Sequence, residues 1–231
     1  ELAWSPDGSR LAFVAPVDPP RFLVGDRPPV GSRGERSPRL RSPIARRITR
    51  GDWRWDEDGH RDRWSHLWVV DAHTSAAPRQ VTSGDWGVSS ITWHPDGRTI
   101  AFESDRGDAP DLRPRSSIWA VDVDAGPRSP RSRPWPMLVT GASTTQPAFS
   151  PDGRWLAAVG TLHPDPLDDV SPGLLLLRAD GTGAARALSP ELDRPIGNWT
   201  DTDLHGWMIA GRTGPAWLDD TTIVSVLTDR G

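Results

Sequence analysis

The chain has 231 residues, 35% of them hydrophobic, which is enough for one large or two small globular domains. Its formal net charge of −4 gives no reason to expect nucleic acid or an anionic membrane as a partner, and the absence of cysteine excludes disulfides and thiolate metal sites. The apolar runs are too short to cross a bilayer. With 24 prolines, 22 glycines and no long helical periodicity, the sequence predicts an all-β fold with many turns.

One short pattern returns along the chain: an aromatic residue, a polar turn containing Asp, and then an apolar run. Clear copies begin at Trp4, Trp93 and Phe149 and contain Pro-Asp-Gly. Degenerate copies without Pro-Asp-Gly begin at Trp55 and Trp217. Proline pre-sets the second position of a type I turn, and glycine takes the left-handed position that closes a hairpin. Each copy therefore predicts two antiparallel strands. The turn aspartates are Asp7, Asp58, Asp96, Asp152 and Asp220.

The strands that follow these turns are expected to be buried on both faces. Runs such as Leu11–Val14 and Ile100–Phe102 are short and continuously apolar, which is typical of strands covered on both sides. Third strands are predicted from similar runs ending near Asp, and fourth strands from runs ending in Thr and Gly. The third strands are Leu67–Asp71, Ile118–Asp122 and Leu174–Leu177; the fourth strands lie near Arg47–Trp53, Gln80–Trp86 and Leu138–Gly141.

Four-stranded units in series predict a β-propeller, because radial stacking buries both faces of each inner strand. We expect about five blades, the last of them cut short, within residues 1–231. The predicted boundaries are 1–50, 51–84, 88–141, 146–189 and 214–231.

Irregular insertions are expected between some strands. Pro16–Arg47 is rich in proline and arginine, with a short strand near Arg21–Val24, and Arg106–Ser116 and Asp124–Pro136 are similar. Within the last of these, Pro127–Arg133 favours a solvated loop over a contact with an anion or nucleic acid. The segment 197–214 contains Trp and Met residues and either faces a partner domain or packs on its own sheet.

No catalytic, metal or cofactor residue is predicted. His60, His66 and His73 lack the close spacing of a zinc helix and favour turn and strand-edge positions. Asp56–Gly59 resembles a calcium loop, but Arg54 stands where the first carboxylate would be, which favours a simple turn.

Two further features are weighed as sites. Gly141–Thr145 lacks the second glycine of a nucleophile elbow and is not expected to hold a catalytic serine. The pairs Asp105-Arg106 and Asp229-Arg230 recur at one position of their units. They favour an ion pair that ties a loop to its blade, with an arginine facing a substrate channel as the alternative.

The order of these segments resembles the propeller of the prolyl oligopeptidase family (peptidase family S9), especially its acylaminoacyl-peptidase-like branch. The Ser-Pro-Asp-Gly units alone are less specific, because TolB-like propellers share them. The segments that carry the resemblance are Asp52–His60, His66–Asp71, Phe102–Arg106 and Leu192–Asn198.

The resemblance implies a non-catalytic, substrate-gating propeller in front of a C-terminal α/β-hydrolase domain with a Ser-Asp-His triad. That domain is expected downstream of Gly231, so the chain is interpreted as part of a longer protein. The parent would be a cytoplasmic serine peptidase that cleaves short or N-acylated peptides and needs no cofactor. The alternative is a TolB-like scaffold for protein–protein interaction with no enzyme attached.

Overall fold

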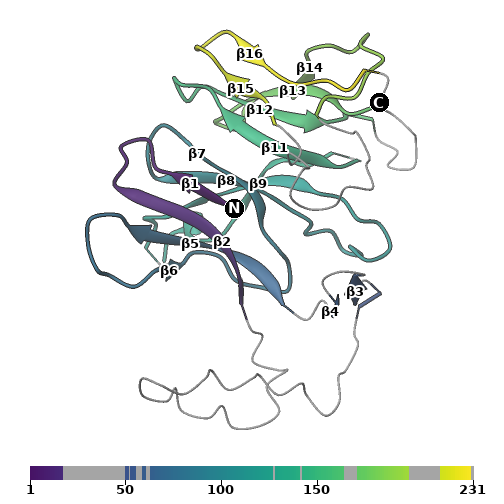
Figure 1. Ribbon diagram of the computed structural model, residues 1–231. Coiled ribbons are helices and arrows are strands. Elements are labelled where there is room, and N and C mark those ends of the chain that lie inside the picture. Colours follow the sequence, from purple (N-terminus) through teal and green to yellow (C-terminus); the bar gives the residue numbers. More distant parts are fainter. Residues whose placement is uncertain are drawn as a thin grey trace.

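Figure 1 shows the computed structural model, in which three four-stranded antiparallel sheets and a two-stranded sheet follow one another along the chain. A small separate hairpin lies beside them. The residues that the structure describes are 1–17, 50–51, 53–55, 59–60, 63–126, 128–140, 142–163, 171–197 and 214–229.

The first sheet has the strand order β1-β2-β5-β6. Its strands are β1 (Leu2–Trp4), β2 (Arg10–Val17), β5 (Trp64–Asp71) and β6 (Arg79–Gln80). β2 and β5 pair along their whole length, from Arg10 opposite Asp71 to Val17 opposite Trp64. The predicted division into blades 1–50 and 51–84 is therefore wrong, because a single sheet takes strands from both ranges.

The copy that begins at Trp55 forms a hairpin, but this hairpin is not part of a blade. It consists of β3 (Arg54–Trp55) and β4 (Gly59–His60), which pair only with each other. Its turn aspartate, Asp58, and the predicted strand at 21–24 lie outside the described residues. Five blades were predicted. In the described part of the chain, the stacked units are three four-stranded sheets and the two-stranded sheet of the last copy.

The second and third sheets repeat the order of the first. The second consists of β7 (Ser89–Trp93), β8 (Thr99–Ser104), β9 (Ser117–Asp122) and β10 (Trp135–Leu138), with the 3-10 helix η2 (Pro130–Ser132) before β10. The third consists of β11 (Thr144–Phe149), β12 (Trp155–Gly160), β13 (Gly173–Arg178) and β14 (Arg186–Ala187). The last sheet pairs β15 (Ala216–Trp217) with β16 (Ile223–Val224).

The predicted turn chemistry is present in the three clear copies. Gly8, Gly97 and Gly153 have φ angles of 70, 66 and 70°, the left-handed region in which glycine carries no steric cost. In each turn the preceding Asp accepts backbone N–H groups from residues that follow it, as Asp96 Oδ1 does from Arg98 and Thr99 at 2.8 and 2.9 Å. Local residues therefore determine these hairpins.

The last turn corrects one predicted residue. Trp217 pairs with Ile223, whereas Trp93 pairs with Ile100, so the last turn is one residue shorter. Asp219 rather than Asp220 consequently accepts the N–H groups of the following residues, at 2.8 Å each from Thr221 and Thr222.

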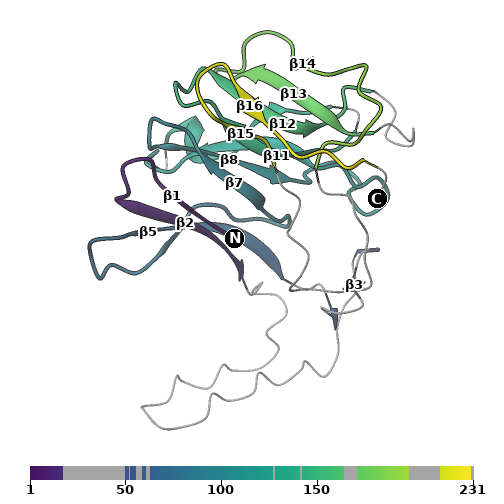
Figure 2. The same cartoon turned by 45° about the horizontal axis from the view of Figure 1, so that its top comes forward.

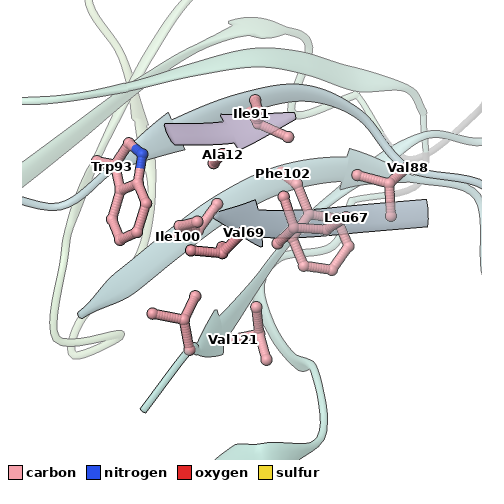
Figure 3. Packing of buried hydrophobic residues seen from close by; sticks show 10 residues of the cluster. Ala12, Leu67, Val69, Val88, Ile91, Trp93, Ile100, Phe102 and Val121 are labelled. Atoms are coloured by element: carbon pink, nitrogen blue, oxygen red, sulfur yellow. The ribbon is translucent and has the colours of Figure 1, made fainter. Parts of the chain in front are cut away.

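Neighbouring sheets pack face to face, and an alanine of each second strand lies in the core between its sheet and the next. Ala12 packs with Ile100 and Phe102 of the second sheet, as Figure 3 shows. Ala101 in turn packs against Leu156 of the third sheet. All of these side chains are fully buried, so the prediction of inner strands covered on both faces is confirmed for β8 and β12.

This arrangement is that of a β-propeller, in which like sheets stack around an axis with their first strands innermost. β1, β7, β11 and β15 contact one another in sequence, and Figures 1 and 2 show the sheets fanning out from this side. No helix among the described residues is long and apolar enough to span a membrane.

Candidate functional site

A cavity of about 390 Å³ lies where the first strands of the sheets begin, and we call it the axial cavity. Each of the four stacked sheets contributes residues from the same place in its copy. They are the residues three and two positions before the aromatic residue, except that the first sheet contributes only the first of these. The lining residues are Glu1, Ser90, Ile91, Gln146, Pro147, Gly214 and Pro215. The cavity is thus a product of the repeat and of no single blade.

Two of these positions hold a backbone conformation that side chains rarely adopt. Ser90 and Gln146 have φ angles of 49 and 54°, and they are the only residues other than glycine with positive φ in the described part of the chain. Each lies at a register shift in its first strand, a β-bulge. Backbone strain of this kind is often found at functional sites.

The bulge in β7 binds a carboxylate. The N–H groups of Ser90 and Ile91 donate to the two carboxylate oxygens of Glu1 at 2.7 and 2.8 Å. The Ser90 hydroxyl donates to Glu103 Oε2 at 3.0 Å. The half-buried Ser90 therefore binds two carboxylates. Its backbone N–H donates to Glu1, and its hydroxyl donates to Glu103.

The loop after β8 contains the predicted Asp105-Arg106 pair, but these two residues do not form the favoured ion pair. Asp105 accepts the backbone N–H groups of Gly107 and Arg115 at 3.1 and 2.9 Å. Among the described residues, Arg106 instead contacts two indoles, with its guanidinium carbon 4.3 Å from the Trp86 ring centroid and 4.2 Å from that of Trp119.

Arg106 is a partly desolvated cation. Burial lowers its pKa below that of a solvated arginine, and its buried Nη1 has no hydrogen-bond partner among the residues that the structure describes. The two indole faces compensate part of this desolvation through cation–π attraction. The arrangement ties the loop to the inter-sheet core, and whether Arg106 also faces substrate stays a prediction.

The second Asp-Arg pair is described in part. Asp229 Oδ1 accepts from Arg194 Nε at 2.8 Å, while Arg230 lies outside the described residues. Arg194 precedes the bridge between Ile196 and Leu227. Asp229 therefore ties the last sheet to the segment that leads into it.

His66 and His73 do not form a shared site. His66 is buried in β5, with Nδ1 3.2 Å from Thr82 Oγ1 and Nε2 3.1 Å from the Gly84 carbonyl. Burial lowers its pKa, although the bond to Gly84 acts in the opposite direction. His73 is exposed beyond the end of β5, and nothing is described of the His60 side chain. The described residues contain no group of three or more potential metal ligands.

The remaining sequence candidates have local roles or lie outside the described residues. Ser143 Oγ accepts the backbone N–H of Ser116 at 3.3 Å, in the link between β10 and β11. Arg131, in the loop interpreted as solvated, is exposed and stacks on Trp135 at 4.6 Å. Residues 56–58 of the calcium-like segment and 198–213 of the segment before the last sheet are not described.

The axial cavity was missed by motif-based reasoning, although the sequence contains a signal for it. In the four copies that form the stacked sheets, the residues three before the aromatic are Glu1, Ser90, Gln146 and Gly214. These are polar residues or glycine, where an alternating strand on a buried sheet would place apolar ones. Aligning the copies on their aromatic residues would have isolated this position.

Comparisons with known proteins agree with the fold. Residues 49–158 match the family model described as the dipeptidyl peptidase IV (DPP IV) N-terminal region. No curated protein matches the chain significantly. The resemblance to S9 peptidase propellers inferred from the sequence is confirmed by this match.

Similar solved structures include two of acylaminoacyl peptidases. One, from Pyrococcus horikoshii in an orthorhombic crystal form, has a TM-score of 0.59 and 12% identity. The alignment covers 100% of this chain and 28% of the peptidase chain. The other, in complex with Z-Gly-Gly-Phe-chloromethyl ketone, has a TM-score of 0.53 and 14% identity over the same shares. These identities show the fold alone.

TolB propellers are also similar. TolB from Acinetobacter baumannii has a TM-score of 0.48 and 16% identity, covering 100% of this chain and 43% of its own. Putative TolB from Agrobacterium tumefaciens has a TM-score of 0.43 and 26% identity, covering 56% of this chain and 43% of its own. The chain thus spans less than half the length of these similar structures.

Proposed function

We propose, from the DPP IV N-terminal-region match of residues 49–158, that this chain is the non-catalytic, substrate-gating propeller portion of an S9 serine peptidase. The parent would cleave short or N-acylated peptides with a C-terminal α/β-hydrolase domain that carries the Ser-Asp-His triad. We include a cytoplasmic location in the proposal.

The family match is the observation that carries this proposal, and the axial cavity gives it a physical form. A volume of about 390 Å³ lies in the range of small-ligand sites and is far too small for a folded domain. Short, extended chains can enter such a space, so a propeller placed over an active site would admit them and exclude folded proteins. The contribution of this chain to catalysis would be access.

The test compares the full-length protein with residues 1–231 alone on short chromogenic peptides and on an N-acetylated amino-acid ester. We expect the full-length protein to turn over these substrates and to take up an organophosphate label on its serine. The isolated chain should do neither. Translation of the gene beyond Gly231 should first reveal a Gly-x-Ser-x-Gly elbow followed by Asp and then His.

A full-length protein that neither turns over any of these substrates nor takes up the label would overturn the peptidase proposal. The TolB-like scaffold without an attached enzyme would then replace it. Activity in residues 1–231 alone would contradict the non-catalytic role of the propeller.

A further inference from the structure

Of the bulges at the mouth of the axial cavity, only the one in β7 can direct two backbone N–H groups at one ligand. Ser90 and Ile91 both have an N–H, whereas the equivalent bulge in β11 is Gln146-Pro147, and proline has none. At the same position of the last sheet stands Gly214-Pro215, again with a proline. Two other copies of the repeat therefore lack the second N–H donor, because proline stands at the position of Ile91.

The chemistry of the β7 bulge is that of a carboxylate receptor. Two adjacent N–H groups in a turned backbone form a concave anion-binding pair, and each donates to one oxygen of the Glu1 carboxylate. The distances of 2.7 and 2.8 Å are those of hydrogen bonds to a charged acceptor. Glu1 itself therefore shows which group the site accepts.

The left-handed φ of Ser90 is the cost of this geometry. A residue with a side chain loses about 1–2 kcal/mol in this region relative to its preferred conformations. A regular strand would alternate its N–H groups and direct only one of the two toward the cavity. The strained bulge is what brings both N–H groups to the same side.

We propose that the Ser90–Ile91 bulge is a carboxylate-binding site of the axial cavity, and that Glu1 occupies it until the C-terminal carboxylate of a short peptide replaces it. Glu1 is exposed, so its released side chain can be solvated. The peptide carboxylate takes the place of the Glu1 carboxylate, and Glu103 continues to accept the hydrogen bond of the Ser90 hydroxyl. The number of carboxylates that contact Ser90 is therefore unchanged. Only the identification of the ligand as a peptide rests on the proposed function.

Binding is measured by equilibrium dialysis of radiolabelled N-acetylglycine against the full-length protein, after any reactive serine has been blocked with organophosphate. N-acetylglycinamide, which differs in having no charge, is the matched probe. The δ1-methyl NMR signal of Ile91, which lines the cavity, reports whether the probe binds there. We expect the acid to bind and to shift this signal, and the amide to do neither.

Two variants test the exchange. Glu1→Gln should tighten N-acetylglycine binding on the order of tenfold, because it removes a tethered competitor with a high effective concentration. Ile91→Pro should weaken binding about tenfold or more by deleting one hydrogen bond to a charged group, while Ile91→Val should not. Pro147 shows that the fold accepts proline at this position.

A third probe separates the sources of the carboxylate. This probe is N-acetylglutamic α-amide, which keeps a free side-chain carboxylate and has no terminal one. Equal binding of this probe would assign the site to acidic side chains and overturn the C-terminal preference. Equal binding of acid and amide, or no change in Glu1→Gln, would overturn the exchange. Because the measurement does not use activity, an inactive parent that still binds the acid would refute only the peptidase proposal.

Discussion

The indole N–H of Trp93 donates a hydrogen bond to the backbone carbonyl of Ala3, at 3.1 Å, across the boundary between the first and second sheets. Trp217 makes the same contact with the Ala148 carbonyl at 3.0 Å between the third and the last. Phe149 occupies the equivalent position in the third sheet and has no N–H to donate. At Trp93 and Trp217 the aromatic residue that starts the copy therefore links two sheets by a hydrogen bond as well as by packing.

Replacing Trp93 by Phe should lower the free energy of unfolding by about 1 kcal/mol through the hydrogen bond alone, with further loss because the smaller ring leaves space. The measurement is urea denaturation of the full-length protein. Trp135→Phe is the control, since Trp135 is only half-buried and stacks on an exposed arginine. An equal effect of both substitutions would contradict the cross-sheet tie.

The turn glycines should differ in their tolerance of a side chain. Gly97→Val should cost on the order of 1–2 kcal/mol or more, because φ is 66° and a β-branched residue is poorly tolerated there. Gly153→Ala should cost more than Gly97→Ala, since its new Cβ would lie 2.7 Å from His94 Nε2, whereas Gly97 has open space.

Thermal unfolding of these variants checks the prediction. Gly126→Ala is the matched control, because Gly126 has open space around it and no left-handed φ. Unchanged melting temperatures for both Gly97→Ala and Gly153→Ala would remove the assigned role of these turns.

Asp152 should remain ionised to an unusually low pH. The hydroxyl of Ser150, followed by the backbone N–H of Arg154, lowers its pKa to about 2 from 3.8. A carboxylate with a lowered folded-state pKa stabilises the fold above the unfolded value of 3.8, and this contribution is lost as the pH falls toward 2. Carboxyl-carbon NMR titration should show the low pKa, and Ser150→Ala should raise it.

His66 should make the stability of the fold depend on pH in the weakly acidic range, below pH 6.5. Burial lowers its pKa from 6.5, so the unfolded chain binds the proton more tightly. The neutral ring stabilises the fold above pH 6.5, and this contribution decreases as the pH falls below that value. Urea denaturation at pH 7 and pH 5 should show a smaller difference in His66→Gln than in the exposed control His73→Gln.

The sequence by itself determined the hairpins and the inner strands. Their information is local: Pro95, Asp96 and Gly97 specify a turn with their own backbone preferences and side-chain hydrogen bonds. The continuous apolar runs such as Ile100–Phe102 similarly require cover on both faces, and only stacked sheets provide it. Repetition of such units was sufficient to predict a propeller.

Only the tertiary structure decided which hairpins share a sheet and what faces the axis. The pairing of β2 with β5 joins residues on either side of a long insertion, and no local preference indicates such a partner. A turn one residue shorter likewise moved the capping role from Asp220 to Asp219, because hydrogen bonds depend on backbone geometry. The Glu1 contact with Ser90 arises only when strands far apart in the chain meet at the axis, where packing between sheets sets the distance.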